Sequence, residues 1–116
     1  MFALTSSFRY YLYRQPCDMR KSFDGLCGLV RTEFGAQPTS GDVYIFLNKR
    51  RTHVKLLRWE AGGFVLYYKR LESGTFTAPL RGSDPRISWY ELVAMIEGIR
   101  VQKMTRAKRF QLEEIE

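Results

Sequence analysis

The apolar residues of this chain gather in short runs typical of β-strands. Residues 8–13 (FRYYLY) are rich in aromatic side chains and predict a first strand, which ends before Pro16. Three later runs have the same character and predict strands at Val43–Leu47, His53–Trp59 and Phe64–Leu71. Polar and glycine-containing turns separate these three strands, so we expect two consecutive hairpins.

Two other stretches repeat apolar residues at helical spacing. Apolar side chains recur on one helical face between residues 19 and 34, with Asp18 as the expected N-cap and Gly35 as the stop. Near the other end, Ser88-Trp89-Tyr90-Glu91 has the spacing of a capping box. The apolar residues that follow it predict a second helix that ends near Gly98.

The order strand, helix, three strands, helix indicates an α+β protein. We expect a mainly antiparallel sheet of about four strands with two helices packed on one face. The length of 116 residues fits one compact domain, which we place at residues 1–100. Residues 101–116 join a basic stretch to three acids, and we interpret them as a charged C-terminal appendage. No apolar run is long enough to span a membrane.

The second hairpin permits a prediction of which side chains share a face. If its loop has an even number of residues, side-chain alternation creates two sets. The first set suits the protein core and contains Lys55, Leu57, Trp59, Phe64, Leu66 and Tyr68. The second set suits a wet binding surface and contains Val54, Leu56, Arg58, Val65, Tyr67 and Lys69. A three-residue loop would reverse the pairing.

The positive charge of the chain is concentrated in the same region. The formal net charge is +7, and the segment from Lys49 to Arg70 holds seven basic residues and one acid, Glu60. Cations at this density neutralise phosphates, and an exposed aromatic ring can stack on a base. The alternative is a solvated outer face that binds nothing. Trp59 and Tyr68 are more typical of core residues than of stacking residues.

These features predict a nucleic-acid surface formed by a basic β-hairpin. The candidate nucleic-acid-binding residues are Lys49, Arg50, Arg51, Lys55, Arg58, Lys69 and Arg70, together with Arg20 and Lys21. Contacts between such cations and phosphates position a protein on DNA without reading its sequence.

Cysteine and histidine are too scarce for a zinc site of the Cys/His type, which needs four ligands. Cys27 falls on the apolar face of the first predicted helix, so we interpret it as a small core residue. Two alternatives remain, a disulfide between Cys17 and Cys27 and a nucleophilic pair of Cys17 with His53.

The carboxylates are scattered along the chain. A metal-dependent nuclease would need Asp18, Asp42 and Glu60 to converge on the same ions. Helix capping by Asp18 and a turn at Asp42 explain these acids without catalysis. We therefore predict no catalytic residue, no metal site and no cofactor, and hold the nuclease as an alternative.

A series of ordered blocks runs from about residue 8 to residue 100. The blocks are Asp18-Met19-Arg20-Lys21, Phe23-Asp24-Gly25-Leu26, Phe46, Asn48-Lys49-Arg50-Arg51, Lys55, Leu57, Trp59-Glu60, Gly63-Phe64, Tyr68-Lys69-Arg70-Leu71-Glu72, Gly74, Phe76, Leu92 and Glu97-Gly98. In this order they resemble the small accessory proteins of insertion-sequence-66 type transposons. These proteins are often labelled TnpB, a name shared with unrelated RNA-guided nucleases.

The resemblance implies a bacterial protein encoded beside a larger transposase that cleaves and joins the DNA. We expect a non-catalytic accessory factor in the cytoplasm, associated with the nucleoid, with DNA and the transposase as partners and no membrane. The alternative is an adaptor that docks on the transposase, or forms a homo-oligomer, without contacting DNA. An exposed edge strand at residues 8–13 would favour that alternative.

Overall fold

The computed structural model describes residues 4–80 and 82–98. The elements are β1 (Tyr10–Leu12), α1 (Phe23–Glu33), a short 3-10 helix (Pro38–Ser40), β2 (Val43–Leu47), β3 (His53–Glu60), β4 (Gly63–Arg70), β5 (Arg86–Ile87) and α2 (Trp89–Glu97). The predicted appendage at residues 101–116 lies outside the described residues. In the described part of the chain, no helix is both long enough and apolar enough to cross a membrane.

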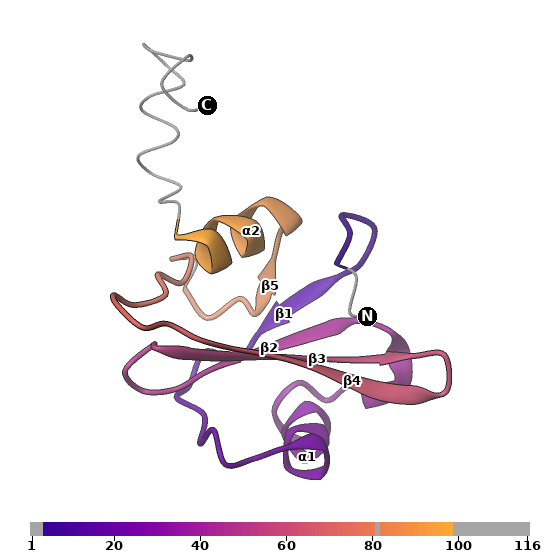
Figure 1. Ribbon diagram of the computed structural model, residues 1–116. Helices are drawn as coiled ribbons and strands as arrows, with labels where there is room; N and C mark the ends of the chain where they lie inside the picture. The colour runs from indigo at the N-terminus through magenta and orange to yellow at the C-terminus, as the bar shows by residue number, and fades with distance from the viewer. Residues whose placement is uncertain (1–3, 81, 99–116) are drawn as a thin grey trace.

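One five-stranded sheet in the order β4-β3-β2-β1-β5 forms the centre of the molecule (Figure 1). β1 and β2 run parallel, and the other neighbouring strands run antiparallel. Parallel neighbours need a long crossover connection, and α1 lies within that connection. The predicted α+β class and mainly antiparallel sheet are confirmed. A fifth strand, β5, adds to the four that the sequence predicts.

The two helices cover opposite faces of the sheet (Figure 1), so the prediction of both helices on one face is wrong. On one face, Leu26 and Val30 of α1 pack with Tyr44, Phe46 and Leu57. On the other face, Leu92, Met95 and Ile96 of α2 pack in a cluster with Tyr10, Leu12, Ile45 and Leu56. Every residue of β2 is buried, as expected for a central strand covered on both sides.

The register of the β3–β4 hairpin confirms the predicted pairing of side chains. Its loop has two residues, Ala61 and Gly62, and Lys55, Leu57 and Trp59 lie opposite Tyr68, Leu66 and Phe64. The proposed wet face is wrong, because Val54 and Leu56 are fully buried in the cluster beneath α2. A second helix layer turns that face into a second core.

Local signals near the helix ends have mixed outcomes. The capping box is confirmed, since the Ser88 side chain accepts from the Glu91 backbone and Glu91 reaches back to Ser88. Asp18 is not the N-cap of α1, because the helix begins later, after Ser22.

The predicted edge at residues 8–13 is also wrong, because β1 lies between β2 and β5. The outer strand on the hairpin side is β4.

Candidate nucleic-acid interface

The β2–β3 turn is held in shape by the side chain of Asn48. Its Oδ1 accepts hydrogen bonds from the backbone N–H groups of Thr52 and His53, at 2.8 and 2.9 Å. Its Nδ2 donates to the Thr52 hydroxyl at 3.0 Å. The Arg51 carbonyl accepts from the backbone N–H of Phe76 at 2.7 Å, which ties the turn to the segment after β4. The turn is therefore a fixed platform and not a loose loop.

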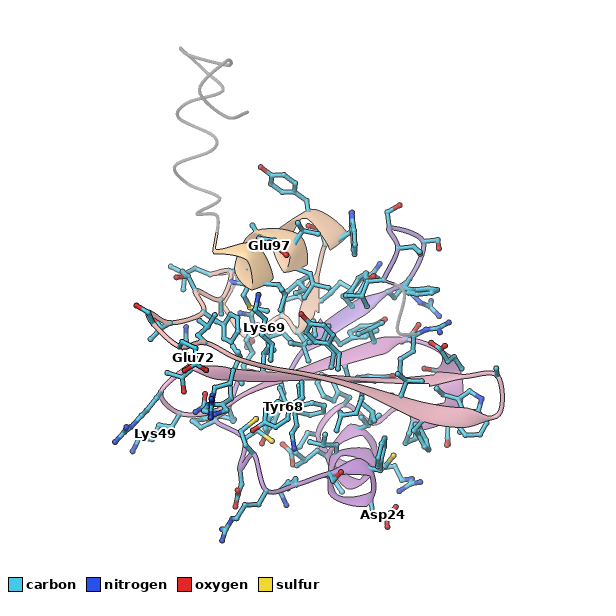
Figure 2. The ribbon with its side chains drawn as sticks, in the orientation of Figure 1. Asp24, Lys49, Tyr68, Lys69, Glu72 and Glu97 are labelled. Carbon is cyan, nitrogen blue, oxygen red and sulfur yellow. The ribbon has the colours of Figure 1, made fainter. Side chains whose placement is uncertain are left out.

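Three consecutive cations project from this platform. Lys49, Arg50 and Arg51 are exposed, and within the described residues none of them forms an ion pair. Figure 2 shows Lys49 at the extreme end of the sheet, pointing away from both helices. Lys49 and Arg51 also line a hollow of about 120 Å³ that has no carboxylate among its lining residues. An anion reaching this end of the molecule meets uncompensated positive charge.

A second cationic segment precedes α1 and is fixed by Lys55. The Lys55 ammonium donates to the carbonyls of Met19 and Lys21, both at 2.7 Å, and the side chain is only 5% exposed. Asp18 shapes the same segment by accepting a hydrogen bond from the Arg20 backbone at 2.9 Å. Arg20 and Lys21 themselves are exposed. Lys55 thus stabilises the segment before α1 from inside the protein. The prediction that it contacts phosphate conflicts with its burial.

Tyr68 lies where these segments meet. The Lys55 ammonium sits over its ring, 4.6 Å from the centroid, so the ring is beside the Met19–Lys21 segment that the same ammonium holds. The His53 ring is 5.9 Å from the Tyr68 ring, and His53 is bonded through Nδ1 to the Thr52 hydroxyl of the turn. Tyr68 is 53% exposed, which contradicts its predicted place in the core.

Arg70 completes this group, two residues beyond Tyr68 on the same face of β4. We call the surface formed by Arg20, Lys21, Lys49, Arg50, Arg51 and Arg70 the cationic end. Two of its members have acidic neighbours: Arg20 pairs with Asp18 at 2.7 Å and Arg70 with Glu72 at 2.9 Å. Both pairs are solvent-exposed, and such pairs contribute little to stability and exchange partners readily.

The Asp18–Arg20 pair changes the pKa of the Asp18 carboxyl. Hydrogen bonds from the Arg20 side chain, and then from its backbone N–H, lower the pKa of the Asp18 carboxyl to about 2. Asp18 is therefore ionised at neutral pH and reduces the net charge of the Met19–Lys21 segment. Lys21 has no such partner among the described residues.

Two other predicted contact residues are engaged inside the protein. Arg58 donates to the Gly41 carbonyl at 2.9 Å, pairs with Glu60 at 3.0 Å and lies over the Phe8 ring. Lys69 donates to the Ile96 carbonyl at 3.2 Å, and Figure 2 shows it on the α2 side of the sheet. These cations hold the loop before β2 and the end of α2. The nine predicted residues therefore do not form one continuous surface.

The carboxylates of the nuclease alternative do not converge. Asp18, Asp42 and Glu60 each form an ion pair with a different arginine. In the described part of the chain, no three residues among His, Cys, Asp and Glu are grouped as a metal ion would need. These three carboxylates therefore do not form the metal-binding centre that the nuclease alternative requires.

The two cysteines are free and buried on the α1 side of the sheet. Cys27 thus has the core position that the sequence predicts. The Cys17 thiol donates to the Asp18 carbonyl, and burial raises its pKa. A nucleophilic cysteine needs a lowered pKa, so the environment of Cys17 is unsuited to the Cys17–His53 alternative.

A larger open hollow of about 460 Å³ lies beside Tyr11, Phe34 and Tyr44, and no residue of the cationic end lines it. Two of its charged lining residues already have partners. Arg14 donates to the carbonyls of Pro79 and Asp84, and Asp42 pairs with Arg9. Arg14 and Asp42 are thus used to join elements of the fold.

Comparisons with known proteins identify the family of this chain and a relative. A family model described as IS66 Orf2 like protein matches residues 8–106. The chain is 31% identical over 110 residues to "Uncharacterized protein y4jC" of Sinorhizobium fredii (strain NBRC 101917 / NGR234). That alignment covers 94% of this chain and 92% of the relative. No solved structure is a significant match.

Proposed function

The chain belongs to the IS66 Orf2-like family, and we propose that it serves as an insertion-sequence accessory protein by binding DNA through its cationic end. The observation that carries this proposal is the β2–β3 turn. Three adjacent cations, which form no ion pair with any other described residue, stand on a loop that Asn48 holds rigid. Because the backbone of the turn is already ordered, binding does not require the loop itself to be ordered, so more of the attraction for phosphate becomes affinity.

The role proposed for this surface is binding without catalysis. Arginine and lysine at the cationic end suit phosphate oxygens, whereas the nearest acids, Asp18 and Glu72, are each paired with an arginine. Phosphate contacts alone do not read sequence. Selection of the transposon ends would then depend on DNA form or on the transposase as a partner.

The test is the salt dependence of DNA binding by the full chain. Log affinity falls linearly with log salt concentration, and each phosphate contact on duplex DNA adds about 0.9 to the steepness of that fall, which we call the salt slope. We expect the triple variant Lys49→Ala/Arg50→Ala/Arg51→Ala to lower that slope by about 2–3 and to weaken binding at every salt concentration.

A matched control removes the same charge elsewhere. Arg9, Arg31 and Arg86 are exposed and lie outside the cationic end. The triple variant Arg9→Ala/Arg31→Ala/Arg86→Ala should keep the wild-type slope. Equal losses in the two triple variants would mean that net charge, and not the cationic end, governs binding.

A second candidate function is an adaptor for the transposase, and the open edge of β4 favours it. β4 has eight residues and, within the part of the chain that the structure describes, pairs only with β3, so its other side can accept a strand from a partner protein. Co-purification with the transposase, together with no binding to any DNA at near-physiological salt, would support the adaptor over the DNA-binding factor.

A further inference from the structure

The exposed ring of Tyr68 stands at the edge of the sheet, with its two faces in different surroundings. The Lys55 ammonium, which covers one face, comes from β3, directly opposite Tyr68 in the register. Among the described strands β4 is the outermost, and none of them lies on its other side. The ammonium covers one face of the ring and Tyr68 is still 53% exposed, so much of the ring surface is open to solvent.

The ring is held firmly in this position. Lys55 is itself fixed by two carbonyls at 2.7 Å, so the ammonium that supports the ring has little freedom. The His53 ring packs at 5.9 Å and 38° and supports Tyr68 from the turn side. A pre-oriented aromatic ring with one open face is the form of a stacking platform.

Other aromatic residues of the hairpin lack this geometry. Trp59 and Phe64 pack against each other at 4.9 Å, edge to face. Tyr67 lies on the opposite face of β4 and packs against the α2 core. Among the described hairpin residues, Tyr68 thus combines an open ring face with the surrounding cationic end.

We infer that Tyr68 stacks on an unpaired base while the cationic end holds the flanking phosphates, so the preferred ligand is single-stranded DNA. This inference rests on the proposed function and names the form of DNA that the site takes. The bases of an intact duplex are stacked on one another, so their faces are closed to a side chain. An unpaired base exposes both faces and can lie on the open side of Tyr68.

The test compares three probes of equal phosphate count: a single strand of thymidines, a strand of abasic sites and a blunt duplex. We expect the wild-type full chain to bind the thymidine strand more tightly than the abasic strand. Tyr68→Leu should weaken binding to the thymidine strand by about 5- to 150-fold, the range for loss of one stacked base. Affinity for the abasic strand and the duplex should change less than about twofold.

Two further variants separate stacking from folding and from charge. Tyr68→Phe keeps the ring and should bind the thymidine strand as the wild type does, whereas Tyr68→Leu keeps apolar bulk without aromaticity. Neither variant should alter the salt slope, because Tyr68 neutralises no phosphate. Circular dichroism and the urea midpoint verify that both variants are folded.

The outcomes of these experiments distinguish the stacking inference from the proposal that the cationic end binds DNA. If Tyr68→Leu binds the thymidine strand like the wild type while the turn triple variant loses affinity, the stacking inference is overturned and the DNA-binding proposal stands. If neither variant changes the affinity or slope, both fail. An RNA strand of matched length that binds far more tightly than the DNA strand would overturn the assignment to DNA.

Discussion

At the scale of single residues, Lys55 shows how a buried cation can organise a binding surface that it does not itself form. Its ammonium joins two carbonyls before α1 to the ring of Tyr68. Two segments that are distant in sequence, Met19–Lys21 and β4, therefore meet at one nitrogen atom. The exposed cations Arg20 and Lys21 owe their position beside Tyr68 to this contact.

We expect Lys55→Met to destabilise the protein by about 2–4 kcal/mol. The variant leaves two buried carbonyls without their charged donor, and hydrogen bonds to charged groups are among the strongest in proteins. Urea unfolding followed by circular dichroism measures the change. Lys49→Met is the matched control, with an expected change within about 0.5 kcal/mol because Lys49 is exposed and unpaired in the described residues.

The same two variants should separate stability from binding. Lys49→Met is expected to weaken DNA binding with little effect on stability. Lys55→Met is expected to lower stability and, under conditions where the variant is folded, to have little effect on DNA binding. A Lys55→Met protein as stable as the wild type would contradict the role assigned to this residue. The sequence could not reveal that role, because the partners of Lys55 are backbone carbonyls 34 and 36 positions away.

At the scale of elements, the β3–β4 hairpin fixes which side chains can cooperate. Its two loop residues both have positive φ, +50° for Ala61 and +85° for Gly62, as a type I′ turn requires. The two-residue loop sets the register that brings Lys55 opposite Tyr68. Alternation and an even loop were enough to predict this pairing, since both are local properties.

Ala61 is a strained choice for the first position of this turn. A non-glycine residue in the left-handed region costs about 1–2 kcal/mol, and asparagine tolerates it best. We expect Ala61→Asn to stabilise the protein by about 0.5–1 kcal/mol. Thermal or urea unfolding measures this change, and Ala61→Val should destabilise the protein as the control. No difference between the two variants would argue against the I′ geometry.

At the scale of the whole molecule, one sheet separates two cores, and this arrangement explains where prediction from sequence failed. The patterns located the four predicted strands to within about two residues at each end and gave the α+β class, because both depend on neighbouring residues. The number of covered faces depends on where α1 and α2 dock, which no local pattern specifies. The hairpin face that the sequence predicts to be a wet binding surface is therefore part of the core. Arg58 and Lys69 on that face donate hydrogen bonds to backbone carbonyls inside the protein.

The strand order could not be predicted from the sequence, for a related reason. β1 is parallel to β2 through the α1 crossover and is also paired with β5, a strand of two residues far along the chain. So short a strand has no sequence pattern of its own. The edge available to partners is consequently β4 and not residues 8–13. Tyr68 lies on that edge, so its exposure could be recognised only once the order was known.

The division into two cores predicts that mutations on opposite faces of the sheet act independently. Val30 is fully buried on the α1 side, and Ile45 is fully buried on the α2 side. We expect Val30→Ala to cost about 1–3 kcal/mol and Ile45→Val about 0.5–1.5 kcal/mol, from lost burial and the cavity left behind. The double variant should equal the sum within about 0.5 kcal/mol, because the two sites share no packing partner across the sheet.

Urea unfolding of the wild type, both single variants and the double variant measures this additivity. Leu26→Val combined with Val30→Ala is the comparison, since both residues lie in the α1 cluster and should couple by more than about 0.5 kcal/mol. Strong coupling between Val30 and Ile45 would mean that strain passes through the sheet from one layer to the other. Mutations beneath α2 would then also change the geometry of the cationic end. If the cores are independent, only the packing on the α1 side, where Lys55 and Tyr68 lie, determines that geometry.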